Sequence, residues 1–184
     1  QRAIEINSHY SKPENNLGNA LSELNRYDEA IEHYKKAIEI EPGYAEAFNN
    51  LANALRKKGK LAKSIFYYNE AIRQKGTYHE AYFNLGVTLS QQGKYVEAIS
   101  QYKKALAINR RFKQAHNNLA GLLAQNDKIE DAIFHYKQAL AIDPGFAKAQ
   151  NNLGSMFARK GNYKEAIAYF EKALVINPNY TDAR

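Results

Sequence analysis

The chain has 184 residues, of which 45% are hydrophobic and 24% are charged, and it contains no cysteine. This composition is ordinary for a folded protein, and it excludes a disulfide framework and a zinc site built from thiolates. No apolar run approaches the ~18 residues that a membrane-spanning helix needs, so we expect no membrane partner. Basic residues outnumber acidic residues by 26 to 19, which gives a net charge of +7.

The positive charge is distributed unevenly along the chain. Residues 11–44 carry four basic and seven acidic residues, whereas residues 45–78 carry seven basic and two acidic residues. A positively charged surface attracts partners of the opposite sign. The pattern therefore favours a protein or peptide client with acidic character near residues 45–112. Nucleic acid is a less favoured alternative partner for the same basic repeats.

A unit of 34 residues repeats along the chain. Full repeats occupy residues 11–44, 45–78, 79–112, 113–146 and 147–180, while residues 1–10 match the end of a preceding repeat and residues 181–184 the start of a further one. Self-similarity at such a period is the signature of a solenoid, in which each repeat contacts its neighbours. We expect a single array over residues 1–184. Because its end repeats are cut, we also expect self-association through uncapped ends near Ile167, Phe170 and Leu174.

Each repeat has the pattern of a helical hairpin. We number positions 1 to 34 within a repeat, starting at residues 11, 45, 79, 113 and 147. Leucine at position 7, glycine or alanine at position 8, and leucine or phenylalanine at position 11 share one face of a first helix. Small residues at positions 20 and 27, with an aromatic ring at position 24, predict a second helix that packs closely on the first.

Turn and cap residues mark the ends of these predicted helices. Position 15 holds glycine, asparagine or aspartate, which tolerate the left-handed conformation of a tight turn. Pro42, Pro144 and Pro178 at position 32 are expected to end the second helix, although the second and third repeats lack this proline. The run Ser11–Glu14 has the pattern of a capping box with Pro13 in the first turn, which predicts a helix start.

At these positions the chain resembles the tetratricopeptide repeat family over nearly its whole length. The leucine–glycine pair at positions 7 and 8, the alanines at 20 and 27, the aromatic at 24 and the proline at 32 together carry the resemblance. It implies an all-α fold, a right-handed superhelix of helical hairpins, in which the first helix of each repeat lines the concave face.

Asparagines are concentrated on the first helix of every repeat. They occupy position 6 (Asn16, Asn50, Asn84, Asn118, Asn152), position 5 (Asn15, Asn49, Asn117, Asn151) and position 9 (Asn19, Asn53). Asparagine is a poor helix former, so a compensating role is expected. A primary amide both donates and accepts hydrogen bonds, and can pair with the backbone of an extended peptide without reading its side chains. We therefore predict a groove that binds an extended peptide, with Arg56 and Lys57 at its edge.

Similar asparagine arrays line the concave face in the tetratricopeptide portion of O-linked N-acetylglucosamine transferase. The alternative is that the asparagines are inherited by duplication or serve the scaffold. Replacing Asn50, Asn84 and Asn118 together with alanine tests the two readings, because loss of a binding residue should leave folding intact. The lysine and arginine pattern of the family's carboxylate clamp is absent from this sequence.

No other motif indicates catalysis, a cofactor or a metal site. The basic run Arg56–Lys60 is typical of a solvated helix end. His9, His33, His79, His116 and His135 occupy positions 33, 23, 1, 4 and 23 of their repeats, so we expect them to converge nowhere and to form no metal site. The sequence therefore predicts a non-catalytic scaffold that binds a protein or peptide. The main alternative is the substrate-recruiting arm of a larger enzyme such as a glycosyltransferase.

Overall fold

A computed structural model describes the backbone of residues 2–178 and the side chains of residues 10–178. Residues 179–184, which include the last two positions of the fifth repeat and the expected start of a further one, lie outside the described residues. All regular structure in the described part is α-helical. The helices are α1 (Arg2–Glu23), α2 (Tyr27–Ile40), α3 (Ala45–Lys57), α4 (Leu61–Gln74), α5 (His79–Gln91), α6 (Tyr95–Ile108), α7 (Lys113–Gln125), α8 (Ile129–Ile142), α9 (Ala147–Arg159) and α10 (Tyr163–Ile176).

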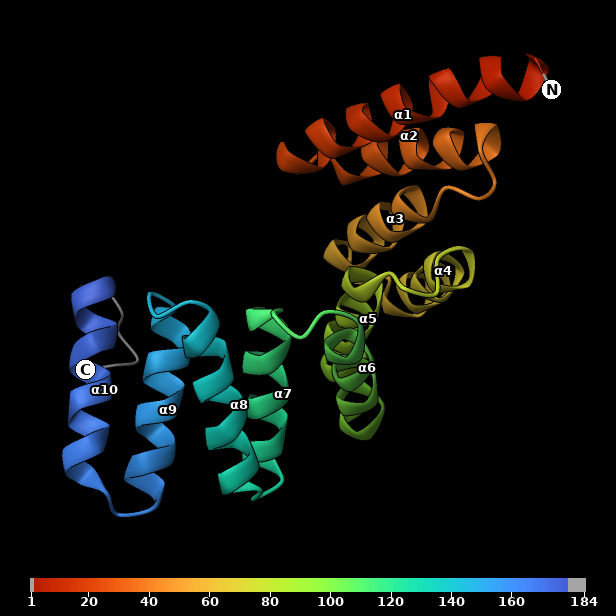
Figure 1. Ribbon diagram of the computed structural model, residues 1–184. Helices are drawn as coiled ribbons and strands as arrows, with labels where there is room; N and C mark the ends of the chain where they lie inside the picture. Colours follow the sequence, from red (N-terminus) through yellow and green to blue (C-terminus); the bar gives the residue numbers. More distant parts are fainter. Residues whose placement is uncertain (1, 179–184) are drawn as a thin grey trace. The chain divides into compact units, whose positions relative to one another are not determined.

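The chain divides into two compact units, residues 1–101 and residues 102–184. In the first unit, α1 pairs with α2 and α3 with α4, while α2 packs on α3 and α4 on α5 (Figure 1). In the second unit, α7 pairs with α8 and α9 with α10, and α8 packs on α9. Each unit is thus a stack of helical hairpins, and the predicted all-α solenoid fold is confirmed.

The two helices of a hairpin approach closely at position 8 of the repeat. A Cβ atom added to Gly18 would lie 2.5 Å from the ring of Tyr34, and one added to Gly154 would lie 2.8 Å from the ring of Phe170. In the second repeat, position 8 is Ala52, which is fully buried. The small residue at position 8 therefore makes room for the aromatic ring at position 24, as the sequence pattern predicts.

The turn inside each hairpin uses a left-handed residue at position 15. Asn25 and Asp127 both have φ of 58°, and the three glycines at this position have φ between 72° and 78°. The next backbone N–H then bonds back to the first helix, as in Arg26 N to Leu21 O at 2.9 Å. The prediction that position 15 needs a residue tolerant of this conformation is confirmed.

The second helices end at the same repeat position whether or not proline follows. The backbone N–H at position 31 bonds to the carbonyl of the alanine at position 27, for example Glu41 to Ala37 and Lys75 to Ala71, each at 3.0 Å. Pro42 follows the first of these helix ends and Gly76 the second. Proline is therefore compatible with this helix end but is not its cause.

The predicted helix start at Ser11 is wrong. Helix α1 begins at Arg2 and continues through Pro13 to Glu23. The Ser11 hydroxyl, which is fully buried, donates instead to Glu41 Oε2 at 2.6 Å, across to the end of α2. Ser11 therefore joins α1 to the end of α2, and the local pattern alone could not reveal this partner.

Within residues 2–178, no helix combines the length and the apolar character that a membrane span requires.

The small residue at position 27 generates a first prediction. Ala71 on α4 is fully buried against Phe48 and Ala81, which belong to α3 and α5. Ala71→Leu adds carbon atoms to a site without space for them, so we expect it to lower the free energy of unfolding by about 1–3 kcal/mol. The same exchange at exposed Ala62, also on α4, is the matched control and should change it by less than about 0.5 kcal/mol. Equal midpoints of the two variants in a urea titration would contradict the packing described here.

Candidate peptide-binding surface

The asparagines at positions 5 and 6 join neighbouring repeats. Those at position 5 are buried, with exposed fractions between 3% and 6%. The position-6 side chain of the next repeat donates its Nδ2 to the position-5 Oδ1. These bonds run from Asn50 to Asn15 at 3.0 Å, from Asn84 to Asn49 at 3.1 Å and from Asn152 to Asn117 at 3.2 Å. Position 5 therefore serves the contact between repeats, which differs from the role predicted for it.

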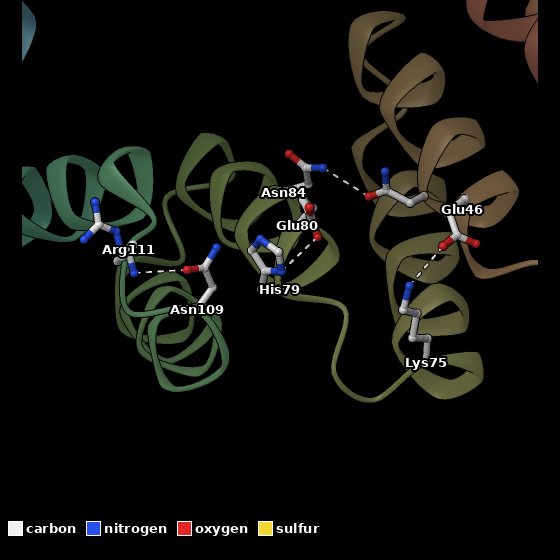
Figure 2. A network of polar contacts seen from close by, with 8 residues as sticks. Glu46, Lys75, His79, Glu80, Asn84, Asn109 and Arg111 are labelled. Atoms are coloured by element: carbon white, nitrogen blue, oxygen red, sulfur yellow. Dashed lines mark hydrogen bonds and ion pairs between the residues drawn. The ribbon is translucent and has the colours of Figure 1, made fainter. Parts of the chain in front are cut away.

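The bonded asparagines at position 6 remain partly accessible. Asn84 on α5 reaches across to α3 through its Nδ2, and the Lys75–Glu46 ion pair lies nearby (Figure 2). Asn50 uses its Nδ2 twice, because it also donates to Asn19 Oδ1 at 3.0 Å. Asn50 thus uses both hydrogens of its NH2 group, whereas Asn84 and Asn152 use one each. Outside Asn50, position 6 can still offer a client both a donor and an acceptor.

Position 9 presents its amide differently, because a buried tyrosine fixes it. The Tyr68 hydroxyl donates to Asn53 Oδ1 at 2.6 Å, and the Tyr34 hydroxyl donates to Asn19 Oδ1 at 2.9 Å. Burial raises the pKa of both phenols, so they stay protonated and act as donors. With each Oδ1 held inward, the NH2 group of Asn19 and of Asn53 is left to face outward. Asn19 is exposed and Asn53 is half-buried.

A polar cleft of about 240 Å3 lies beside Asn53 in the first unit. Its walls come from the end of α1, the start of α2 and the second half of α3. Lining it are Ser22, Glu23, Asn25, Tyr27, Asn53, Ala54 and Lys57. The structure thus brings the predicted residues Asn53 and Lys57 together at one hollow on the first-helix side of the hairpins.

The neighbouring basic residues have mixed roles. Lys57 is exposed, whereas Arg56 is half-buried and its Nε has no hydrogen-bond partner within the described residues. Lys58 forms an ion pair with Asp28 of the preceding repeat. Lys160 and Glu130 repeat this pairing at 2.5 Å in the second unit. Part of the positive charge therefore ties repeats together instead of facing a partner.

The second unit has fewer amides on its first helices. Asn118 and Asn152 are partly accessible, and Asn117 donates to Asn118 Oδ1 at 3.2 Å. Position 9 is Gly121 and Ser155 here, so no amide takes the place of Asn19 or Asn53. Asn16, in the first unit, is exposed on α1. Most of the accessible asparagines on first helices thus belong to the first unit, on α1, α3 and α5.

Comparisons with known families agree with this arrangement. Tetratricopeptide repeat models match residues 43–111, 89–153 and 147–180, and a TPR repeat model matches residues 18–59. Together they cover residues 18–180 without a gap. The chain belongs to the tetratricopeptide repeat family. Chains of this family are typically interaction scaffolds.

Several solved tetratricopeptide structures are similar to this chain. YrrB, described as a TPR protein with an unusual peptide-binding site, is 26% identical with a TM-score of 0.74, over 99% of this chain and 94% of its own. MamA is 25% identical with a TM-score of 0.76, over 92% of both chains. PilF of Pseudomonas aeruginosa, at 17% identity and a TM-score of 0.90, covers 96% of this chain and 81% of its own, and shares the fold. No curated protein matches the chain.

The prediction that the histidines do not converge is wrong for one pair of this tetratricopeptide array. His116 on α7 and His135 on α8 lie with their Nδ1 atoms 2.9 Å apart. His116 Nε2 also lies 3.1 Å from the Arg110 carbonyl, to which it must donate. His116 Nδ1 is then the acceptor, and His135 Nδ1 carries the proton between the rings. Positions 4 and 23 face each other in the hairpin, which spacing along one helix does not indicate.

Both rings of this pair are held neutral. Burial lowers the pKa of His116, and burial together with the neighbouring His116 lowers the pKa of His135 to about 4. Asp131 opposes the shift of His135 and Lys103 adds to it. No group of three or more possible metal ligands occurs within the described residues. The pair is therefore best understood as a packed, hydrogen-bonded contact between α7 and α8.

This histidine pair predicts an acid-sensitive hairpin. The folded pKa values lie below the unfolded value near 6.5, so the stabilisation is complete above that pH and is lost as the pH falls toward the folded values. Between pH 7 and pH 5 we expect the free energy of unfolding to fall by about 1–2 kcal/mol more than in the double variant His116→Gln and His135→Gln. Gln150 shows that glutamine fits position 4, because its Nε2 bonds to the Pro144 carbonyl at 3.0 Å. Parallel pH profiles from urea titrations of the two proteins would refute this account.

The bond between Asn84 and Asn49 gives a further prediction, opposite to the sequence expectation that position 6 can be removed without cost. Asn84→Ala leaves the buried Asn49 Oδ1 without its donor, which should lower the free energy of unfolding by about 1–3 kcal/mol. Asn69→Ala, at an exposed site on α4, should stay within about 0.5 kcal/mol of the parent. Urea unfolding measures both. If Asn84→Ala is as stable as Asn69→Ala, the amide bond between repeats does not contribute to the free energy of unfolding.

Proposed function

We propose that the chain is a non-catalytic interaction module that binds an extended peptide along α1, α3 and α5 of the first unit. The observation that carries this proposal is the fixed orientation of Asn19 and Asn53. Each has its Oδ1 occupied by a buried phenol, and each has its NH2 group left for a ligand. Amides oriented before binding lose little freedom when a ligand arrives, which favours affinity.

The chemistry of these groups suits a peptide backbone. The outward NH2 groups of Asn19 and Asn53 can donate to peptide carbonyls, and the partly accessible Oδ1 atoms at position 6 can accept from peptide N–H groups. A neutral hydrogen bond contributes about 0.5–1.5 kcal/mol net, so a few such contacts give micromolar rather than nanomolar binding. The surface would discriminate little between different side chains of the client, except at the polar cleft.

The cleft beside Asn53 supports a client with some acidic character. Lys57 lines it, whereas Arg56, the preceding residue, does not line the cleft and has a buried Nε. An acidic side chain of the client placed there would meet Lys57, while Glu23, which also lines the cleft, limits how much negative charge the cleft accepts. We therefore propose a single acidic residue at this point of the client, within a sequence that is otherwise loosely specified.

The likeness to other tetratricopeptide structures supports a peptide or protein as partner. YrrB is described by its peptide-binding site, and its likeness extends over nearly the whole of this chain. The asparagine array that resembles the tetratricopeptide portion of O-linked N-acetylglucosamine transferase adds to the same proposal. The role of recruiting arm in a larger enzyme agrees with this binding mode, because such an arm would use the same surface.

Nucleic acid is the weaker candidate for the basic repeats. Of the cations in residues 45–78, Lys58, Arg73 and Lys75 are engaged with Asp28, Glu70 and Glu46. A phosphate backbone would have to compete with these carboxylates. A salt titration distinguishes the two kinds of partner, because nucleic-acid binding would lose orders of magnitude in affinity between about 50 and 200 mM salt.

An isosteric exchange at position 9 tests the proposal. The double variant Asn19→Asp and Asn53→Asp keeps the acceptors for Tyr34 and Tyr68 but removes the outward donors. Peptides of about twelve residues selected from a random display library on the parent chain should bind this variant at least tenfold more weakly, by fluorescence anisotropy.

Asn69→Asp, at an exposed position of α4, controls for added negative charge and should bind like the parent. Repeating the titration with a charge-free selected peptide separates loss of the donors from repulsion. Unchanged affinity of the double variant, or selected peptides that bind through the second unit alone, would reject the proposed surface.

A further inference from the structure

The face of α1 that other repeats bury is open in this chain. Leu17, at position 7, is 47% exposed, whereas Leu51, Leu85, Leu119 and Leu153 at the same position are between 0% and 4% exposed. Leu24, directly after the end of α1, is exposed to 66%. In the later repeats of each unit, the second helix of the preceding repeat packs beside this face, as α2 does on α3. The apolar face of α1 thus has the form of a site for another second helix.

The opposite face is open on α10. Ile167, at position 21, is 56% exposed, while Ile31 and Ile133 at the same position are 6% and 7% exposed. Phe170, at position 24, is half-buried, whereas Tyr34 and Tyr68 there are fully buried. In the first unit the first helix of the following repeat packs on the second helix at this place. The face of α10 has the form of a site for a first helix such as α1.

An amide oxygen on α9 lacks the hydrogen-bond donor that a further helix packed on α9 and α10 would supply. Among the described residues, Asn151 Oδ1 is buried and has no hydrogen-bond partner. At the same repeat position, Asn15, Asn49 and Asn117 each accept from an asparagine at position 6 of the next repeat. A buried acceptor without a donor costs about 1–3 kcal/mol, so this atom favours any neighbour that supplies an amide there.

The first repeat of this chain supplies such a donor. Asn16 occupies position 6 on the open face of α1, is exposed, and has no side-chain hydrogen bond within the described residues. The charges are complementary as well, because residues 11–44 carry four basic and seven acidic residues and residues 147–180 carry five basic and two acidic residues. Apolar fit, amide pairing and charge thus point to one occupant, a second copy of this chain.

We propose that copies of the chain associate head to tail, with α1 of one copy packed on α9 and α10 of the next and its Asn16 bonded to Asn151. The contact reproduces the one that α3 makes with α1 and α2 inside a unit. Because two different faces meet, each added copy presents a new open face, and association continues with concentration instead of closing at a dimer. It shares α1 and Asn16 with the proposed peptide surface but uses neither Asn19 nor Asn53, so the double variant at these two positions separates peptide binding from self-association.

Sedimentation velocity of the 184-residue chain tests this contact, over about 1–500 µM, a range wide enough for micromolar association. The weight-average mass should rise steadily with concentration. Asn16→Ala should weaken association about tenfold while the exposed-site control Asn69→Ala leaves it unchanged. A monomer at every concentration, or equal association of these two variants, would overturn the proposal.

Two variants that each block one face test the head-to-tail geometry. Leu17→Lys should abolish the α1 face and Ile167→Lys the α10 face, and both sites are already exposed enough to accept lysine. Each variant alone should be monomeric, because one of its two faces is blocked. An equimolar mixture should form a one-to-one dimer and nothing larger. Self-association of either variant alone, or a mixture that stays monomeric although circular dichroism shows both to be folded, would refute the geometry.

Discussion

The structure depends on one close contact inside each hairpin, between a residue without a bulky side chain and an aromatic ring. At Gly18 there is no room for even a methyl group beside Tyr34, and the same holds at Gly154 beside Phe170. This contact brings the two helices together and so buries the position-24 ring between them. In the first unit the buried hydroxyl then reaches the first helix and holds an asparagine amide there. The surface proposed to bind a peptide is therefore oriented by the packing that stabilises the hairpin.

The asparagines of the first helix divide into three roles that their spacing alone does not separate. Position 5 faces the neighbouring repeat, position 6 bridges to it while keeping some exposure, and position 9 is held by a tyrosine. Adjacent helix positions differ by about 100° in direction, so residues that look equivalent in sequence can be buried or exposed. Hydrogen bonds between repeats compensate for most of the poor helix propensity of these asparagines. The amide groups that make no such bond are available to a ligand.

The periodic features of this fold could be predicted from the sequence, and the features that depend on contacts between helices could not. Small residues at position 8 and left-handed residues at position 15 are local requirements, so the sequence alone predicts the roles of Gly18 and Asn25. Ser11 was misread because its partner, Glu41, lies at the end of another helix. The His116–His135 contact was missed because it joins positions 4 and 23 across a hairpin. The NH2 groups at position 9 could be identified as donors only once Tyr34 and Tyr68 were placed.

The buried tyrosine at position 24 also sets an alkaline limit on the fold. Burial raises the pKa of Tyr68 and Tyr34, and raises that of Tyr136 to about 12. A free phenol ionises near pH 10, so the stabilisation from these rings is intact below that pH and is lost as the pH rises toward the folded values. Ionisation would place a negative charge on a ring that is buried between two helices. Ionisation of these rings would therefore separate the two helices of a hairpin, and a rise in tyrosinate absorbance that coincides with loss of helical circular dichroism would report it.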